Sequence, residues 1–287
     1  MESDLGFLYL KRKIIANGIN CTGYKDDFLK RRFEGRMRLK GLATFAEYAH
    51  YIDKTPAEFK DLLDALTINV SEFYRDATVW DVLRRDILPA MVKEKLASGR
   101  KELKTWSAGC ADGEETYTVA LIILETLSYL YKSFKIEVLG TDVDLASLNR
   151  AKRGVYAPVR LKPVSQLILQ RYFTPCENGN FKISEVVKSL VTFKTHDLFT
   201  SPPSSGLDII TCRNVIIYFS RELQLKLFRN FYDALAPGGF LILGKVESII
   251  GDTTALFKCV NIAERIYRRS PDPALSSVPS PVASRSA

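Results

Sequence analysis

Apolar residues in the first 66 positions recur three or four residues apart, which is the spacing of one face of a helix. The first such face runs from Leu5 to Ile15 and stops before Thr22-Gly23, and a basic segment from Lys25 to Lys40 follows. A third helix is expected around 45–52, and Pro56 begins a fourth, because a proline in the first helical turn needs no N–H partner. The pattern predicts a small helical bundle.

From about residue 100 the pattern changes to short apolar runs that alternate with helical segments. The expected strands lie at 103–108, 135–139, 207–211 and 240–243, and the expected helices at 114–131, 145–153 and 221–235. The triplet Pro237-Gly238-Gly239 is expected to form the turn between the last helix and the last strand. Strands that alternate with helices form a parallel sheet covered on both faces, so the predicted fold class is α/β.

Between residues 154 and 197 that alternation is interrupted. Asn178-Gly179 is a good hairpin signal, and the segments on either side, 171–173 and 181–184, predict a small antiparallel ribbon. Two short apolar segments near the C-terminus are expected to complete the large sheet as an antiparallel pair, at 255–260 and 265–268.

The composition is that of a globular protein without a membrane span. The hydrophobic share is 46%, and no apolar run approaches the roughly 18 residues that a membrane helix needs. Glu2 and Asp4 stand where a secretory signal would carry basic residues. The five cysteines lack metal-ligand spacing, and His50 and His196 lie far apart, so we expect free thiols in the cytoplasm and no metal site.

Much of the net charge of +8 comes from the basic segment 25–40. Such a segment suits nucleic acid, anionic lipid or an acidic protein surface, and it is equally typical of a solvated helix face. Arg32 and Arg36 are four residues apart, which would place them on one helix face for a docking contact. Charge alone leaves these alternatives open.

The strongest local signal for chemistry is the segment Trp106–Glu115, a predicted strand followed by a loop with two glycines and a helix. The glycines let the backbone approach a ligand, and Asp142 at the end of the next strand can accept both hydroxyls of a ribose. The loop lacks the Gly-x-Gly-x-x-Gly pattern of dinucleotide folds, and Glu114-Glu115 would repel a phosphate. This combination suits a ligand that has a ribose and an amino group but no phosphate, which indicates S-adenosylmethionine. The alternative is that the loop is a generic strand-to-helix turn without a ligand.

Five motifs resemble, in order and spacing, those of the chemotaxis protein glutamate O-methyltransferases, the CheR family. The family's T-x-N-x-T-x-F-F-R, W-S-A-G-C-S-x-G-E-E, G-T-D-I-D, C-R-N-V-L-I-Y-F and L-G-x-S-E are similar to TINVSEFYR at 67–75, WSAGCADGEE at 106–115, GTDVD at 140–144, CRNVIIYF at 212–219 and LGKVE at 243–247. The motifs are specific together, whereas any one alone is not. The agreement runs from about residue 60 to 268, and the N-terminal helices match only as a helical domain.

The resemblance implies a Rossmann-like class I methyltransferase domain with a small antiparallel β-subdomain insertion, preceded by an N-terminal helical domain. The implied divisions are a receptor-docking helical domain at 1–66, a linker and connecting helices at 67–98, a methyltransferase domain at 99–269 with the β-subdomain at about 160–195, and a disordered tail at 270–287. The implied reaction transfers a methyl group from S-adenosylmethionine to glutamate side-chain carboxylates of chemotaxis receptors, in sensory adaptation.

By position, the resemblance assigns contacts with S-adenosylmethionine to Asn69, Ser71, Arg75, Glu115, Asp142, Asp197, Leu198, Asn214 and Val215. Glu115 would take the cofactor's ammonium and Asp142 its ribose, and Asp197 and Leu198 would lie beside the adenine. Asp197 stands where the family has Asn, although a carboxylate can also accept from an adenine amino group. Glu114 suits a helix start, where an acid complements the helix dipole.

Arg75 and Tyr218 are the implied catalytic residues. Arg75 would face the carboxylate of the cofactor or of the substrate, and Tyr218 would lie near the sulfonium. A carboxylate nucleophile is ionised near pH 7, so alignment and desolvation matter more than a general base, and no catalytic His or Cys is needed. The simple alternatives are an ion pair between Arg75 and an acid such as Asp76, and a packing role for Tyr218.

The implied partner is the cytoplasmic domain of a chemotaxis receptor, whose acidic helices suit the basic segment. We expect no nucleic acid, because methyltransferases of exocyclic base nitrogens carry an Asn/Asp-Pro-Pro-Tyr-type motif that this chain lacks, and no membrane insertion. An inactive cofactor-binding adaptor is a second alternative, disfavoured by the intact Arg75 and Tyr218. Part of the family binds a C-terminal receptor pentapeptide at the β-ribbon. The short connection Phe173–Phe181 holds Pro175, which cannot donate to a strand pair, and predicts that this chain works without that tether.

Overall fold

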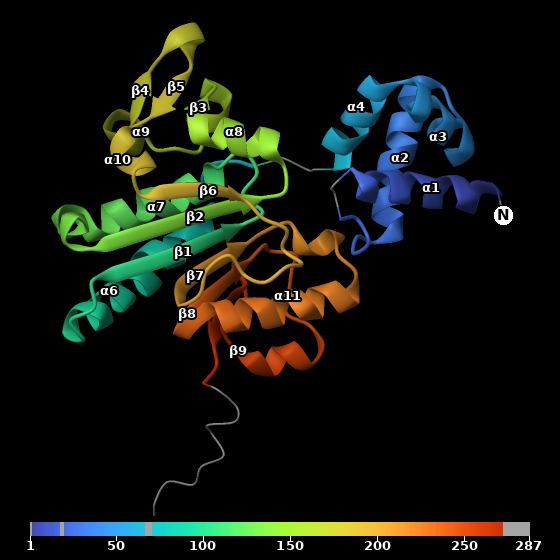
Figure 1. Ribbon diagram of the computed structural model, residues 1–287. Coiled ribbons are helices and arrows are strands. Elements are labelled where there is room, and N and C mark those ends of the chain that lie inside the picture. The colour runs from blue at the N-terminus through green and yellow to red at the C-terminus, as the bar shows by residue number, and fades with distance from the viewer. Residues whose placement is uncertain (1, 18–19, 67–70, 272–287) are drawn as a thin grey trace, which may run out of the picture.

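The helical bundle expected at the N-terminus is present in the computed structural model, which describes residues 2–17, 20–66 and 71–271. Its helices are α1 (Glu2–Ala16), α2 (Asp26–Lys40), α3 (Phe45–Lys54) and α4 (Pro56–Leu66). Thr44 begins α3 with a capping box, in which the side chains of Thr44 and Glu47 each accept the backbone N–H of the other residue. The apolar faces of the helices share a core of their own around Phe33, Tyr48 and Leu62. Figure 1 shows the bundle, in blue, beside the rest of the chain.

A seven-stranded sheet forms the centre of the second part of the chain, with the strand order β6-β2-β1-β7-β8-β10-β9. The strands are β1 (Glu102–Ala108), β2 (Lys135–Asp142), β6 (Val191–Thr195), β7 (Leu207–Cys212), β8 (Leu235–Leu243), β9 (Phe257–Asn261) and β10 (Ile266–Arg269). The strands from β6 to β8 in this order are parallel, and β10 and β9 complete the sheet as the predicted antiparallel pair. Because the parallel strands run the same way, their carboxyl ends meet at one edge.

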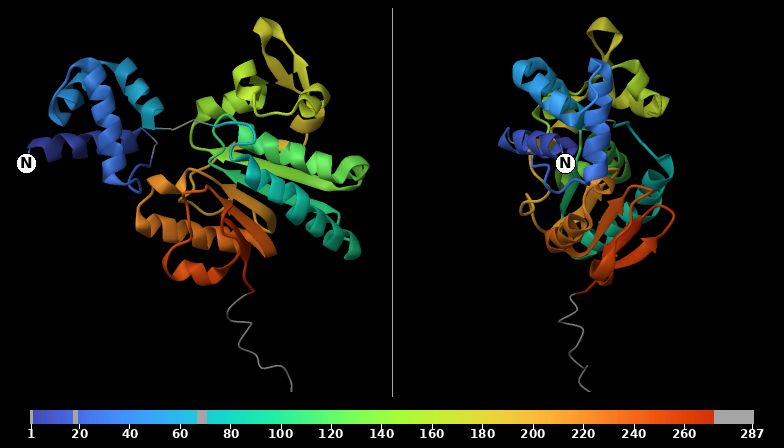
Figure 2. Two further views of the ribbon diagram at one scale, coloured as in Figure 1. Left: turned by 180° about the vertical axis from the view of Figure 1, so that it is seen from behind. Right: turned by 90° about the vertical axis from the view of Figure 1, so that its right-hand side faces the viewer.

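Helices cover both faces of this sheet, as the sequence predicts (Figure 2). They are α5 (Ala77–Val82), the π-helix η1 (Leu83–Ile87), α6 (Leu88–Ala97), α7 (Glu114–Leu127), α8 (Leu145–Arg153) and α11 (Arg221–Ala234). Neighbouring residues of β7 point to opposite faces: Ile209 packs in the core that contains α6 and α7, and Ile210 packs in the core that contains α11. The sheet therefore separates two hydrophobic cores.

The predicted ribbon is part of a smaller antiparallel sheet with the order β3-β5-β4. This region contains β3 (Val155–Tyr156), β4 (Phe173–Pro175), β5 (Phe181–Ile183), α9 (Gln166–Tyr172) and α10 (Glu185–Lys188). Asn178 and Gly179 connect β4 to β5 with φ angles of 57° and 71°, a conformation that an Asn-Gly pair adopts easily. The short 3-10 helices of the chain are η2 (Ser128–Ser133), η3 (Pro158–Leu161), η4 (Glu177–Gly179), η5 (Ile216–Tyr218) and η6 (Gly251–Leu256).

The structure corrects three expectations in this part of the chain. Residues 171–172 end α9 instead of beginning a strand, because the side chain of Ser165 caps a helix that runs through them. The expected range of the β-subdomain, about 160–195, starts after β3 and includes β6, which pairs with β2 in the large sheet. Pro237-Gly238-Gly239 lies within β8, where it bulges out between two paired positions rather than forming a separate turn.

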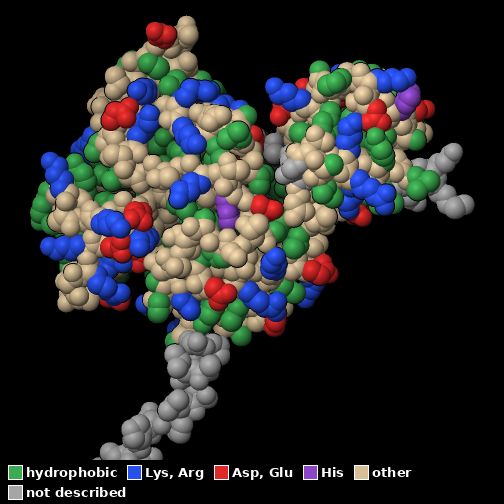
Figure 3. All heavy atoms as spheres, viewed as in Figure 1, with side chains coloured by type: hydrophobic (Ala, Val, Ile, Leu, Met, Phe, Trp, Pro, Cys, Tyr) green, Lys and Arg blue, Asp and Glu red, His purple; other side chains and the backbone are tan. Residues whose placement is uncertain are grey.

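The basic side chains of α2 differ in what they contact. Arg36 donates to both carboxylate oxygens of the buried Glu58, at 2.8 and 2.7 Å, and to Asp61 at 2.7 Å. The expectation that Arg36 belongs to an open docking face is therefore wrong, because its charge neutralises a buried acid. Arg31 and Arg38 are exposed. On the face drawn in Figure 3, basic side chains of the bundle are interspersed with acidic ones.

Two general expectations can be compared with the structure. The five cysteines all lie in described segments, and all are free thiols, as the sequence predicts. In the part of the chain that the structure describes, no helix is both long and apolar enough to cross a membrane.

Candidate active site

The loop predicted to bind the cofactor lies where β1, β2 and β7 end. The N–H groups of Gly109 and Cys110 donate to the carbonyl of Thr141, at 2.8 and 2.9 Å, which ties the end of β1 to the end of β2. The φ angle of Gly109 is 80°, and a Cβ there would lie 2.7 Å from Cγ2 of Val215. Position 109 therefore needs glycine, because both the backbone conformation and the approach of Val215 exclude a side chain.

A cavity of about 120 Å³ opens at this edge of the sheet. Its lining comes from three of the five motifs and consists of Ser71, Glu72, Arg75, Gly109, Ala111, Glu115, Arg213, Asn214, Val215, Ile217 and Tyr218. The structure thus brings together six of the residues assigned from the sequence: Ser71, Arg75, Glu115, Asn214, Val215 and Tyr218. Asn69, which the sequence also assigned, lies outside the described residues.

Glu115 is held at the wall of this cavity by partners on two neighbouring strands. Its Oε1 accepts from the hydroxyls of Ser107 on β1, at 2.9 Å, and Thr211 on β7, at 2.6 Å. Its Oε2 lies 3.4 Å from a guanidinium nitrogen of Arg213. These contacts fix a carboxylate where it can receive a cationic group of a ligand.

Arg213 is a site residue that the sequence interpretation did not assign. Its guanidinium is buried, and it donates to the carbonyl of Arg75 at 2.9 Å and to Oδ2 of Asp76 at 2.6 Å. It also lies over the ring of Trp80, 5.0 Å from the centroid, and the indole N–H donates to the same Arg75 carbonyl at 2.8 Å. Asp76, considered above as a partner for Arg75, is thus bound by Arg213. The position of Arg213 inside the C-R-N motif was the available signal.

These contacts hold a strained piece of backbone around Arg75. Tyr74 and Asp76, on either side of it, have φ angles of 52° and 56°, which residues other than glycine rarely adopt. Strain of this kind persists only where the surroundings over-determine the conformation. Arg75 consequently lines the cavity from a backbone whose path is fixed.

Glu247 is a second residue that the sequence interpretation quoted within a motif but gave no role. It is 3% exposed, and its two oxygens accept five backbone N–H groups at 2.7 to 3.4 Å. The donors are Asn214, Val215, Ile216, Ile217 and Gly244. Burial raises the pKa of Glu247, and the N–H groups oppose that shift. One carboxylate thereby shapes the loop that leads to Tyr218.

Glu114, expected as a helix-start acid, also anchors the segment between the two domains. Its side chain is fully buried, and its Oε1 pairs with Arg160 at 3.0 Å. The same nitrogen of Arg160 donates to the carbonyl of Ser71 at 2.7 Å, so Arg160 links Glu114 to Ser71. Burial raises the pKa of Glu114, and the charge of Arg160 opposes that shift. Glu114 therefore positions Ser71 at the cavity rather than lining the cavity itself.

Asp142, Asp197 and Leu198 lie at the same sheet edge but are not among the described residues that line the cavity. Asp142 ends β2, and its oxygens accept the N–H groups of Ala111, at 2.9 Å, and Asp144, at 3.0 Å. The carboxylate of Asp197 accepts the N–H of Phe199 at 2.9 Å, and Leu198 is buried in the core with α11. The N–H of His196 donates to the carbonyl of Asp142 at 3.0 Å, which keeps these two strand ends adjacent.

The side chains at this edge fit S-adenosylmethionine, which carries a sulfonium, an ammonium and a ribose. Glu115 and Asp142 place two carboxylates on either side of the glycine loop, suited to an ammonium and a ribose. The loop between them, residues 109–113, contains no Lys or Arg that would neutralise a phosphate. Arg75 supplies a cation suited to a carboxylate.

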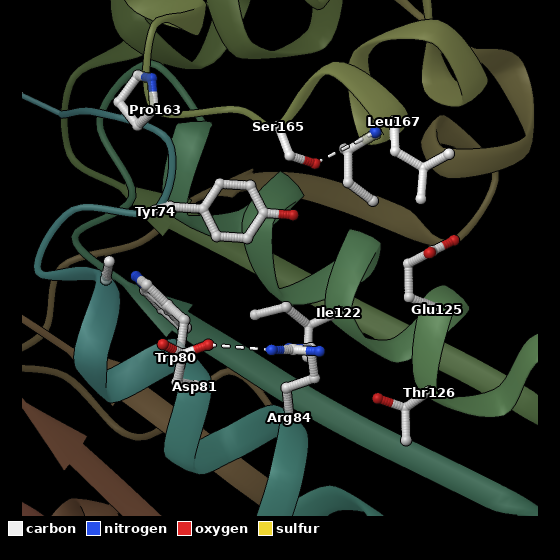
Figure 4. Close-up of a pocket in the computed structure, with 12 residues that line it drawn as sticks. Tyr74, Trp80, Asp81, Arg84, Ile122, Glu125, Thr126, Pro163, Ser165 and Leu167 are labelled. Atoms are coloured by element: carbon white, nitrogen blue, oxygen red, sulfur yellow. Dashed lines mark hydrogen bonds and ion pairs between the residues drawn. The ribbon is translucent and has the colours of Figure 1, made fainter.

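A larger cavity of about 590 Å³ lies beside Tyr74, the residue before Arg75 (Figure 4). Tyr74 and Trp80 form one of its walls, and Ile122 and Glu125 of α7 form another. The ring of Tyr74 points into this cavity, whereas the next residue, Arg75, lines the smaller one. The strained segment therefore separates the two cavities.

Comparisons with known proteins agree with this description. Residues 69–266 match a family model described as CheR methyltransferase, SAM binding domain, and residues 16–67 match CheR methyltransferase, all-alpha domain. The chemotaxis protein methyltransferase of Borreliella burgdorferi is 31% identical over 84% of this chain and 87% of its own length. That of Listeria innocua is 31% identical over 87% of this chain and 92% of its own length. Chemotaxis protein methyltransferase 1 of Pseudomonas aeruginosa is 30% identical over 81% of this chain and 85% of its own.

Proposed function

Because the chain belongs to the CheR methyltransferase family, we propose that it transfers the methyl group of S-adenosylmethionine to glutamate side-chain carboxylates of a chemotaxis receptor, giving glutamate methyl esters. The family makes the chain an S-adenosylmethionine-dependent methyltransferase of chemotaxis. The observation that carries the choice of a carboxylate substrate is the cavity in which Arg75, Tyr218 and Glu115 meet. It offers a cation and a hydroxyl for an anionic nucleophile.

The reaction demands little acid–base chemistry from the protein. S-adenosylmethionine supplies, when bound, a methyl carbon attached to a positively charged sulfur. The side chains around the cavity have no proton to take from the substrate, because a glutamate carboxylate is already ionised near pH 7. Their work is to orient that carboxylate and to remove part of its water.

Three side chains of the cavity divide this work. Arg75 holds the reacting carboxylate through its planar guanidinium, which suits two parallel hydrogen bonds. Tyr218 orients the same group through its hydroxyl. Glu115, fixed by Ser107 and Thr211, takes the ammonium of the cofactor. Arg213 serves as a support, since it bonds the Arg75 carbonyl and contacts Glu115.

The remaining cofactor contacts follow the sheet edge. Asp142 binds the ribose, and Asp197 and Leu198 lie beside the adenine; the adjacency of the β2 and β6 ends supports this arrangement. Asn69 and Ser71 contact the cofactor from the segment between the domains, and Asn214 and Val215 border the methyl-donor end, where both line the cavity.

The proposed partner is the cytoplasmic domain of the receptor, so the proposed site of action is the cytoplasm. The helical domain is proposed to dock on it through exposed basic residues of α2, Arg31 and Arg38. We also propose that the enzyme needs no C-terminal receptor tether. Supporting this, β4 is an edge strand of three residues that includes Pro175, which has no N–H for an added strand.

Incubation with methyl-labelled S-adenosylmethionine tests the proposal. A receptor cytoplasmic fragment should gain label that base releases as methanol, the behaviour of an ester, whereas tRNA and duplex DNA should gain none. The same fragment with its candidate glutamates changed to glutamine should remain unlabelled. Label on nucleic acid would support the rival methyltransferase class, and absence of label on every substrate, with cofactor binding intact, would support an inactive adaptor.

A further inference from the structure

The helical domain touches the methyltransferase domain at the residues that follow the C-R-N motif. Tyr24 and Phe219 form an isolated antiparallel bridge. On either side of it, the N–H of Lys25 donates to the carbonyl of Tyr218 at 2.9 Å, and the N–H of Ser220 donates to the carbonyl of Gly23 at 2.8 Å. Two main-chain hydrogen bonds thus fasten the α1–α2 turn to the segment that carries Tyr218.

The ring of Phe28 lies against the ring of Tyr218. Phe28 is in the first turn of α2 and is 3% exposed, and the two centroids are 4.7 Å apart with an angle of 38° between the planes. Tyr24 stacks on Phe28 at 5.6 Å and meets Phe219 edge-on at 5.4 Å. Tyr218 therefore contacts an aromatic cluster of the other domain and also lines the 120 Å³ cavity.

The methyltransferase domain fixes the backbone before Tyr218. Glu247 binds the N–H groups of Ile216 and Ile217. Packing against Phe28 restricts the ring of Tyr218, because a tyrosine can otherwise change its rotamer without moving the chain. The domains also approach closely at Gly23, where a Cβ would stand 1.5 Å from Cδ1 of Leu223.

From this geometry we propose that the helical domain is part of the methyl-transfer site, with Phe28 as the positioning residue that sets the orientation of Tyr218. The proposal rests on the proposed function in one respect, the role of Tyr218 in methyl transfer. It adds a second role for α2, beside the proposed docking of the receptor. Arg31 and Arg38 are exposed, whereas Phe28 is buried against Tyr218.

A substrate-free measurement separates this proposal from the proposed function. In protein labelled with 3-fluorotyrosine, the 19F resonance of Tyr218 is identified by its loss in Tyr218→Phe. Phe28→Leu should shift or broaden that resonance. The control Phe33→Leu removes a ring of the same domain core, at 0% exposure, whose ring contacts are with Phe7 and Phe45, and should leave it in place. An unmoved Tyr218 resonance in Phe28→Leu, with circular dichroism showing a folded protein, would overturn the proposal even if the enzyme methylates receptors.

Kinetics give the second test. Phe28→Leu should lower kcat on the receptor fragment by about 10-fold to 100-fold, the scale of a misplaced catalytic group, and change the Kd for S-adenosylmethionine by less than about twofold. Adding Phe28→Leu to Tyr218→Phe should lower kcat little further, because both changes remove the same alignment. A full additional drop in the double variant, or an unchanged kcat in Phe28→Leu, would refute the positioning role.

Discussion

The backbone N–H of Asn214 donates a 2.9 Å hydrogen bond to Oε2 of Glu247, 33 residues further along the chain. It is one of five such bonds that converge on this buried carboxylate. Asn214 has a φ angle of 61°, and a Cβ at Gly244 would stand 2.7 Å from the same oxygen. The C-R-N and L-G-x-x-E motifs are therefore two halves of one structure.

Replacing Glu247 with alanine should destabilise the protein strongly. Five N–H donors would lose their acceptor, those of Ile216 and Gly244 in buried surroundings and the other three in partly buried ones. An unsatisfied buried donor costs about 1–3 kcal/mol before water enters. We expect the free energy of unfolding, measured with urea, to fall by at least about 3 kcal/mol. The exposed acid Glu137 on β2 provides a control, since Glu137→Ala should change it by about 0.5 kcal/mol or less. A loss below about 1 kcal/mol for Glu247→Ala would show that the loop does not depend on this carboxylate.

Asp142→Ala should weaken the binding of S-adenosylmethionine by about 1.5–3 kcal/mol, the scale for hydrogen bonds to a charged group. The reasons are the lost ribose acceptor and the lost support for the Ala111 N–H. Asp142→Asn keeps one acceptor oxygen, so its affinity for S-adenosylmethionine should lie between those of Asp142→Ala and the wild type. Calorimetric titration checks the order, and equal affinity in all three proteins would remove Asp142 from the site.

The buried pair of Arg36 and Glu58 should make stability depend on pH. Burial raises the pKa of Glu58, but hydrogen bonds from Arg36, Lys40 and Tyr48 outweigh it and lower the pKa from 4.5 to about 2. Because the folded pKa is the lower one, the pair stabilises the fold above about pH 4.5, and this stabilisation is lost as the pH falls toward 2. The loss should reach up to about 3 kcal/mol. Between about pH 5 and pH 2.5, the free energy of unfolding should fall less with pH in Glu58→Gln than in the wild type. An equal fall in both proteins would refute the ion pair.

Receptor docking should depend on Arg31 and Arg38, which lie seven residues apart on α2 and are both exposed. Reversing both charges should raise the KM for the receptor fragment about tenfold at low salt and leave the Kd for the cofactor unchanged. The difference should shrink as salt rises, because exposed charges are screened. Arg36→Glu is the contrasting variant, since it should destabilise the helical domain by placing a second acid beside the buried Glu58, which would keep Lys40 as its ion-pair partner. Equal KM values for the double reversal and the wild type would place docking elsewhere.

The fold was largely predictable because its signals are local. Helical spacing predicted the bundle, strand–helix alternation predicted the covered parallel sheet, and Asn178-Gly179 predicted the hairpin. The expected range of the β-subdomain included residues 191–195, which form β6 of the large sheet, because so short a run does not show which strand it will pair with. The sequence alone predicts a turn at Pro237-Gly238-Gly239, because a bulge is defined only by its partner strand.

Site residues could be predicted where they belong to a recognised motif. They could not be predicted where their role depends on contacts with residues far away in the sequence. Arg213 bonds Asp76 across 137 residues, and Arg160 bonds Ser71 across 89. The sequence suggests a docking role for Arg36 because no neighbouring residue indicates that it pairs with the buried Glu58, 22 residues away. Spacing along a helix predicts the face on which a side chain lies, but not which other residues pack against that face.

The central claim is that the cavity around Arg75 and Tyr218 aligns a glutamate carboxylate with the methyl donor. The most direct test is the single-turnover rate of methyl-ester formation on a receptor fragment, with Arg75→Ala, Arg75→Lys and wild-type enzyme each saturated with S-adenosylmethionine. We predict that Arg75→Ala lowers this rate by about 100-fold or more while the protein stays folded, and that Arg75→Lys, which cannot bond bidentately, recovers only part of it. A rate for Arg75→Ala equal to that of the wild type would contradict the account.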